Sequence, residues 1–128
     1  MLVPLPIFAI SAKSGDIIVL DKDEVINGNY YAAGNSIEIY GTVNGDLFLA
    51  GSSIKIDSEQ INGDVFAAGN SLKIKVKING SLRLAGQYLE LDGEVARNAM
   101  AFGQSLDLSK NAVVKEHLNF YGQSLGIS

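Results

Sequence analysis

Apolar and polar residues alternate along most of this chain in short segments that recur every 17 to 19 residues. A glycine marks the same point of each repeat, at Gly34, Gly51, Gly69, Gly86, Gly103 and Gly122. Aliphatic residues stand three and five residues after each of these reference glycines, and the residue between them is charged in five of the six repeats. Such i, i+2 spacing predicts a β-strand with one buried face, and no helical spacing persists for two turns. The pattern therefore predicts an all-β chain.

A repeat of this size cannot bury its apolar face alone, so neighbouring repeats must stack. We therefore expect a single-stranded β-helix, a solenoid of triangular cross-section, with about six coils of 17–19 residues and parallel strands paired from coil to coil. Residues 26–128 hold the coils, and residues 13–25, which include Ile18 and Leu20, predict an incomplete first coil. The last repeat stops directly after its second aliphatic residue, so we expect the coils to continue beyond the given chain.

Residues 1–12 differ from the rest of the chain because they combine a run of apolar residues with two prolines and no charge. A secretory signal peptide has a basic start, an apolar stretch and a cleavage site of small residues. The segment Ile10, Ser11 and Ala12 provides such a site, whereas the basic start is missing. We interpret residues 1–12 as a truncated signal peptide, with an apolar N-terminal cap as the alternative. No stretch reaches the ~20 apolar residues of a transmembrane helix.

Charge and residue types exclude several functions. The formal charge is -4, with acidic and basic residues interspersed, so no basic patch exists for nucleic acid. The chain has no cysteine, a single histidine (His117) and neither a P-loop nor a dinucleotide-binding motif. Asp46 and Asp64 recur after Asn-Gly pairs, where we expect them to cap turns. The sequence thus predicts no catalytic, cofactor-binding or metal-ligating residue, and we expect that the protein is not an enzyme.

The middle position of each repeat's first strand points outward in this pattern, and it forms the column Tyr31, Phe48, Phe66, Arg83, Met100 and Asn119. We take Tyr31, Phe48, Phe66 and Met100 as the candidate interaction surface, because stacked apolar side chains on an outer face mark partner or membrane contacts. A ladder that only stabilises neighbouring strands is the alternative. Amide and hydroxyl residues after each reference glycine, such as Asn35 and Ser36, predict hydrogen-bonded ladders at that corner.

The phrases NGDLFLAGSSIKI, INGDVFAAGNSLKI and INGNYYAAGNSIEIYGTV resemble the bactofilin, or polymer-forming cytoskeletal, family. They are most similar to its extracytoplasmic bacterial relatives, which carry such repeats behind a signal peptide. The resemblance covers residues 26 to 128 and is strongest from 26 to 91. It implies a right-handed β-helix that polymerises end to end without nucleotide or metal and binds membrane or cell-wall components. The fifth and sixth repeats depart from it, because they lose the Asn-Gly pair and have Arg97-Asn98 and Glu116-His117 near that corner.

The expected function is therefore a self-assembling structural scaffold at the bacterial cell envelope, secreted or membrane-attached, with copies of itself as partners and no cofactor. A monomeric, surface-displayed solenoid that binds polysaccharide or membrane is the alternative. A hexapeptide-repeat acyltransferase is a remote alternative. It predicts an aliphatic residue at every sixth position, and the uneven spacing of Val43, Leu47, Leu49, Ile54 and Ile56 does not fit it.

Overall fold

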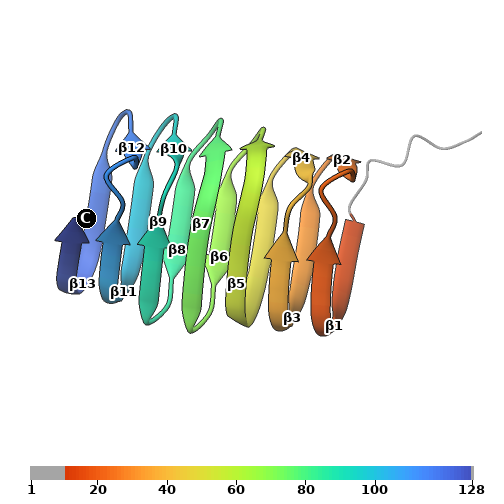
Figure 1. The fold of residues 1–128 in the computed structure, drawn as a ribbon, viewed down its shortest axis with the longest axis horizontal. Coiled ribbons are helices and arrows are strands. Elements are labelled where there is room, and N and C mark those ends of the chain that lie inside the picture. Colours follow the sequence, from red (N-terminus) through yellow and green to blue (C-terminus); the bar gives the residue numbers. More distant parts are fainter. Residues whose placement is uncertain (1–10, 128) are drawn as a thin grey trace, which may run out of the picture.

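The computed structural model describes residues 11–127, and every regular element within that range is a β-strand (Figure 1). The strands lie side by side along one axis, with the first and last at opposite ends. Their bounds are β1 Ser11–Leu20, β2 Val25–Asn27, β3 Tyr30–Ile39, β4 Thr42–Asn44, β5 Leu47–Ile61, β6 Val65–Ala68, β7 Ser71–Ile78, β8 Leu82–Ala85, β9 Tyr88–Leu91, β10 Glu94–Val95, β11 Ala99–Leu108, β12 Val113–Val114 and β13 Leu118–Ile127. The all-β prediction is confirmed.

Each strand pairs in parallel with the strand one repeat further along the chain, which makes the molecule a β-solenoid. The reference glycines are in register from coil to coil, as in the pairs Gly34 with Gly51 and Gly103 with Gly122. The predicted incomplete first coil pairs with β3 over nearly the whole length of β1. It therefore adds one level to the six repeats and gives a stack of about seven turns. The triangular section and the right-handed winding stay predictions.

The interior of the stack is lined by the aliphatic residues that recur in the sequence. Ile37, Ile54, Leu72, Leu89 and Leu106 form one inward column and are nearly inaccessible to water. Apart from Tyr30, whose side chain ends in a phenol, no buried side chain among the described residues carries a polar or charged group. Burial of this apolar surface supplies the main stabilising free energy, at roughly 25 cal/mol per Å². Because each side chain packs against its equivalents in neighbouring coils, the core runs along the whole axis.

Close approach of the backbones explains the reference glycines. A Cβ atom added at Gly51 would overlap the carbonyl oxygen of Gly34 in the preceding coil. The same overlap would arise at Gly69 against Gly51. Only a residue without a side chain fits where two main chains pass this closely. The regular glycine steps in the sequence thus follow from the spacing of the coils.

Side chains at the Asn-Gly corner connect successive coils by hydrogen bonds. Asn44 donates to Asn27 at 2.9 Å, Asn62 donates to Asn44 at 2.6 Å, and Asn79 donates to Asn62 at 2.7 Å. This row is called the asparagine ladder below. Two positions after Asn27, Asn44 and Asn62, a second side chain accepts a hydrogen bond from the backbone N–H of the next coil. Asp46 accepts from Asp64 and Asp64 accepts from Ser81, both at 2.8 Å. Both carboxylates therefore connect neighbouring coils, and their expected turn-capping role stays a prediction.

Differences in coil length are absorbed at one corner, between the second and third strands of a coil. Leu20 and Val25 are five residues apart, whereas their partners Ile39 and Thr42 are three apart. Residues 109–112 make the same extra turn near the other end, because a 3.0 Å bond from the Ala112 N–H to the Ser109 carbonyl closes it. The 18-residue coil places its register shift between Asp57 and Gln60. Only this corner varies in length, so the strand register on the other sides stays constant.

The two ends of the stack differ in how well the inward positions are covered. In β1, Ile18 and Leu20 are buried. In β13, the residues of the same two columns are Leu125, 49% exposed, and Ile127, 77% exposed. The last described turn therefore presents apolar side chains at the end of the core. Of the predicted signal peptide or cap, residues 1–10 lie outside the described residues.

Candidate functional site

Three aromatic side chains stack on one another along the first strands of successive coils. The rings of Tyr31 and Phe48 have centroids 4.6 Å apart at an interplanar angle of 4°, and those of Phe48 and Phe66 are 4.9 Å apart at 5°. Parallel pairing of β3, β5 and β6 holds these residues in register. This row, called the aromatic ladder below, is half-buried, because each ring covers part of its neighbour. The sequence therefore predicted both the outward column and its stacking.

Arg83 follows Phe66 in the same column and ends the aromatic ladder. Its guanidinium carbon lies 5.6 Å from the centre of the Phe66 ring, which is within the range of a cation–π contact. Met100, predicted as part of the interaction surface, is paired with Arg83 one coil further on and is half-buried. Since the arginine lies between them, the structure does not bring Met100 together with the three aromatic residues. The contiguous surface consists of Tyr31, Phe48, Phe66 and Arg83.

A second outward column runs beside the aromatic ladder and was not singled out in the sequence analysis. It consists of Ala33, Ala50, Ala68 and Ala85, which are exposed and in register. Phe102 takes the next position and stacks on Tyr121 with centroids 5.0 Å apart. The recurrence of alanine directly before the reference glycine was the available signal. This row is called the alanine column below.

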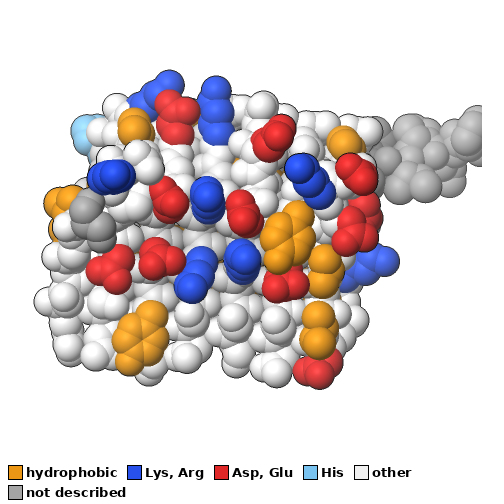
Figure 2. All heavy atoms as spheres, in the orientation of Figure 1, with side chains coloured by type: hydrophobic (Ala, Val, Ile, Leu, Met, Phe, Trp, Pro, Cys, Tyr) orange, Lys and Arg blue, Asp and Glu red, His pale blue; other side chains and the backbone are white. Residues whose placement is uncertain are grey.

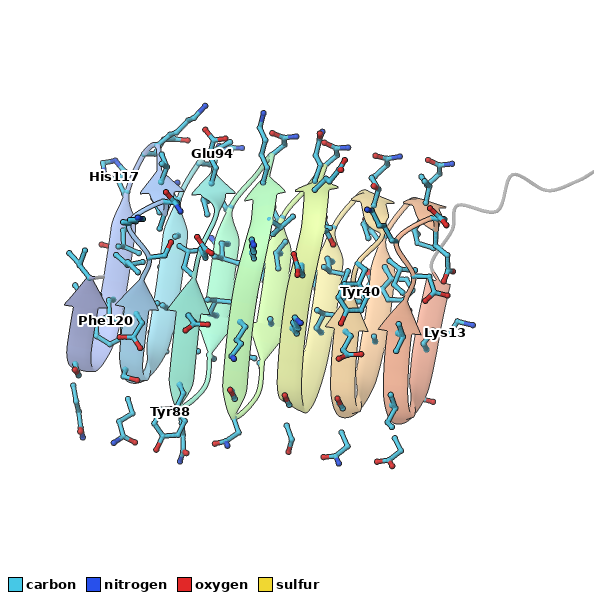
Figure 3. All side chains as sticks on the ribbon, in the orientation of Figure 1. Lys13, Tyr40, Tyr88, Glu94, His117 and Phe120 are labelled. Atoms are coloured by element: carbon cyan, nitrogen blue, oxygen red, sulfur yellow. The ribbon has the colours of Figure 1, made fainter. Side chains whose placement is uncertain are left out.

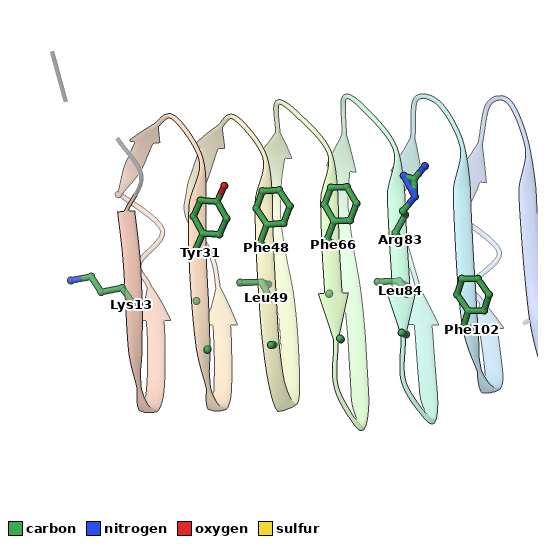
Figure 4. Close-up of a pocket in the computed structure, with 14 residues that line it drawn as sticks. Lys13, Tyr31, Phe48, Leu49, Phe66, Arg83, Leu84 and Phe102 are labelled. Atoms are coloured by element: carbon green, nitrogen blue, oxygen red, sulfur yellow. The ribbon is translucent and has the colours of Figure 1, made fainter. Parts of the chain in front are cut away.

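The aromatic ladder and the alanine column form an open groove along the stack with a volume of about 620 Å³. Figure 4 shows the three rings and Arg83 in one row, with Phe102 set lower beyond the arginine and Lys13 at the opposite end. Lys13 and Arg83 are the charged residues that line the groove. The site is thus an open apolar groove with Lys13 at one end and Arg83 towards the other.

The ladders expected after each reference glycine are made by the main chain. The Asn70 N–H donates to the Ser52 carbonyl at 3.0 Å, and the Gln104 N–H donates to the Gln87 carbonyl at 3.0 Å. Within residues 11–127 the side-chain amide ladder occupies the Asn-Gly corner instead. Backbones approach closely at both corners, but only at the Asn-Gly corner does a donor amide face an acceptor amide in the next coil.

Where the Asn-Gly pair is lost, charged side chains connect the coils. Arg97 lies 3.7 Å from Glu116, and Lys115 lies 3.1 Å from Glu94. His117 sits beside them at the surface, and its backbone N–H donates to the Asn98 side chain at 3.2 Å. Figure 3 shows His117 and Glu94 at this edge of the molecule. These contacts are interactions between neighbouring coils on a solvated corner.

On the face shown in Figure 2, Lys and Arg side chains alternate with Asp and Glu side chains over the surface. A second hollow, of about 540 Å³, is lined by polar side chains that include Lys22, Asp23, Asp57 and Glu59. Among residues 11–127 there is no cluster of three or more His, Cys, Asp or Glu side chains placed to hold a metal ion. In the same range, no helix has the length and apolar character needed to cross a membrane.

Tyr30 is the one large polar-tipped side chain in the core of the described residues. Burial raises the pKa of its phenol, and the negative charge of nearby Glu24 raises it further. Glu24 itself is held by the turn that it closes, since its side chain accepts from the Asp21 N–H at 3.0 Å. Tyr30 thus fills the interior near the N-terminal end as a neutral side chain.

Stacked parallel coils and an apolar outer groove define this protein as a β-solenoid with a candidate binding surface on one side. No family model, curated protein or solved structure matches the chain.

Proposed function

We propose that this protein is a self-assembling structural scaffold whose copies stack end to end, with the coils of one copy continuing those of the next. The observation that carries the proposal is that one coil geometry repeats in register along the described stack, so the edge of one coil matches the edge of any other. The outer strands β1 and β13 each pair on one side only within residues 11–127. A free strand edge is a template for pairing with another chain.

Physical chemistry supports assembly at these ends. An added coil would pair its main chain with a free edge and cover the exposed aliphatic residues, as each coil inside the stack does for its neighbour. A contact between unlike ends does not close on itself and generates a filament, whereas a contact between like ends generates a dimer. The likeness of the repeats to the extracytoplasmic bactofilin relatives adds a location at the bacterial cell envelope to this proposal. The proposed role requires neither catalysis nor a cofactor.

The test uses the chain of residues 1–128 at increasing concentration without nucleotide or metal. We expect oligomers or filaments in analytical ultracentrifugation and electron microscopy. The double variant Leu125→Lys/Ile127→Lys places two charges on the apolar end, so assembly should be lost while the fold persists in circular dichroism.

A matched control is Ser53→Lys/Tyr88→Lys, which adds the same charge at two exposed positions of central coils, away from both ends. It should assemble like the unchanged protein. Monomers at every concentration would overturn the scaffold proposal and favour a monomeric binder, the second candidate, for which the apolar groove is the specific observation. Reproducible hydrolase or acyltransferase activity would contradict a purely structural role.

A further inference from the structure

The apolar groove is long and two residues wide. Its floor, the alanine column from Ala33 to Ala85, spans three coil steps of roughly 4.8 Å each, or about 14 Å. Polar columns border it on both sides: Asn29, Asp46, Asp64 and Ser81 on one, and Asn35, Ser52, Asn70 and Gln87 on the other. Phe102 replaces the small side chain where the floor ends. A strip of this width matches one extended alkyl chain better than the broad surface of a bilayer.

The orientation of the rings disfavours a sugar. Carbohydrate rings pack against the faces of aromatic side chains, but the faces between Tyr31 and Phe48 and between Phe48 and Phe66 are covered, at centroid distances of 4.6 and 4.9 Å. Arg83 covers the remaining face of Phe66. The ring edges therefore line the groove together with alanine methyl groups, and these surfaces favour a flexible aliphatic chain.

The charged residues of the groove determine which ligand charge it favours. Lys13 and Arg83 are the charged residues that line it, and both are cationic in a chain of net charge -4. Within the described part of the chain Arg83 has no carboxylate within 4.0 Å. The bordering carboxylates of Asp46 and Asp64 accept backbone hydrogen bonds and lie at the middle levels, whereas the neutral Ser81 borders the level of Arg83. An anion is therefore favoured at the Arg83 end.

We propose that this groove binds one monomeric fatty acid, with its alkyl chain along the alanine column and its carboxylate beside Arg83. The groove shares no residue with the C-terminal assembly surface, because Leu125 and Ile127 do not line it. The failure of one proposal therefore leaves the other standing.

The test is calorimetric titration of the chain of residues 1–128 with dodecanoate below its micelle concentration. We expect saturable binding of one molecule per chain. Dodecylammonium, with the same alkyl chain and the opposite charge, should bind roughly threefold to fivefold more weakly, since the charges at the site are exposed. Maltohexaose should not bind.

Ala50→Leu fills the middle of the floor and should weaken dodecanoate binding about tenfold or more. Its control is Ser53→Leu, which adds a leucine at an exposed position of the same coil outside the groove. Arg83→Gln should weaken dodecanoate roughly threefold to fivefold and leave the affinity for neutral dodecanol unchanged. Arg97→Gln, the other arginine, should change neither affinity.

Five results would overturn the proposal. Dodecanoate could fail to bind. It could also bind the Ala50→Leu variant as tightly as the unchanged protein, which would place the ligand outside the groove. Binding of maltohexaose, or of lipid vesicles without any affinity for monomeric dodecanoate, would identify a glycan or bilayer surface. Loss of self-association in Ala50→Leu without any ligand binding would identify the groove as a contact between copies.

Discussion

The central coils and the last described turn use the same residue types at the same positions, yet their side chains have different environments. Ile54, in the middle, is fully buried, whereas Leu125, in the same inward column, is 49% exposed. Ile54 is covered by a coil on each side, through Ile37 and Leu72, whereas Leu125 has a neighbouring coil on one side only. Stability in this solenoid is therefore a property of neighbouring pairs of coils, and it should decrease towards an uncovered end.

Truncation of a core side chain should show the largest contrast between these regions. Ile56→Ala removes a fully buried side chain from the central β5 and should lower the free energy of unfolding by about 2–5 kcal/mol. Leu125→Ala should cost less than about 1.5 kcal/mol, because water already reaches this side chain. Chemical denaturation monitored by circular dichroism measures both. Equal losses would contradict the view that the last turn lacks cover.

Replacing a glycine by alanine should cost more stability in a central coil than in the last described turn. Gly51→Ala drives a methyl group into the carbonyl of Gly34 and should cost about 1–3 kcal/mol. Gly126→Ala in the last turn meets only the side chain of Asp107, which can rotate away, so its cost should stay within ~0.5 kcal/mol. Thermal and denaturant unfolding of the two variants provide the measurement. A tolerated Gly51→Ala would mean that the coils can separate without penalty.

The asparagine ladder separates an interior position from a terminal one. Asn62 bonds both Asn44 and Asn79, so Asn62→Ala should cost about 1–2 kcal/mol. Asn79 ends the ladder, because Ala96 follows in the next coil, and Asn79→Ala should cost about half as much. The same denaturation experiment applies. If Asn79→Ala lowered the free energy of unfolding more than Asn62→Ala, the hydrogen bonds of the asparagine ladder would not be the source of the stability.

The smallest effect is expected at the charged corner that replaces the ladder. Arg97 and Glu116 are 67% and 47% exposed, so water and salt screen their attraction. Glu116→Gln should change the free energy of unfolding by less than ~0.5 kcal/mol, and added NaCl should reduce even that difference. Unfolding at low and high salt measures it. A loss comparable to that of Asn62→Ala would show that ion pairs hold the C-terminal coils as firmly as amides hold the central ones.

Much of the fold could be predicted from the sequence because its repeat constrains main chain and core together. The steps between Gly34 and Gly51 and the alternation around Glu38 determine the register and the inward faces without further information. The number of levels was less certain, because residues 21–24 enlarge the corner and hide the match between Ile18 and Ile37. A turn of different length leaves the alternation within each strand intact, but it changes the number of residues between equivalent positions of successive coils.

The site was predictable only in part. Tyr31, Phe48 and Phe66 are conspicuous because large aromatic residues recur at one repeat position, and the structure stacks them. The alanine column was not predicted, because alanine is compatible with either face of a strand. It becomes part of a groove only when larger side chains stand beside it. The amide ladder forms at the corner where the side chains of successive coils come within 3 Å of each other. That distance is set by how the coils stack, so the sequence of one coil does not reveal it.

The corner that absorbs differences in coil length has a practical consequence. Three coils already accept extra residues there, at 21–24, 57–60 and 109–112, while β1, β3 and β5 keep their pairing. An epitope or a fluorescent domain inserted between Ser58 and Glu59 would project sideways from the wall of the solenoid. Such an insertion would leave both tips and the fatty-acid groove unobstructed, so labelled copies could be followed in living cells.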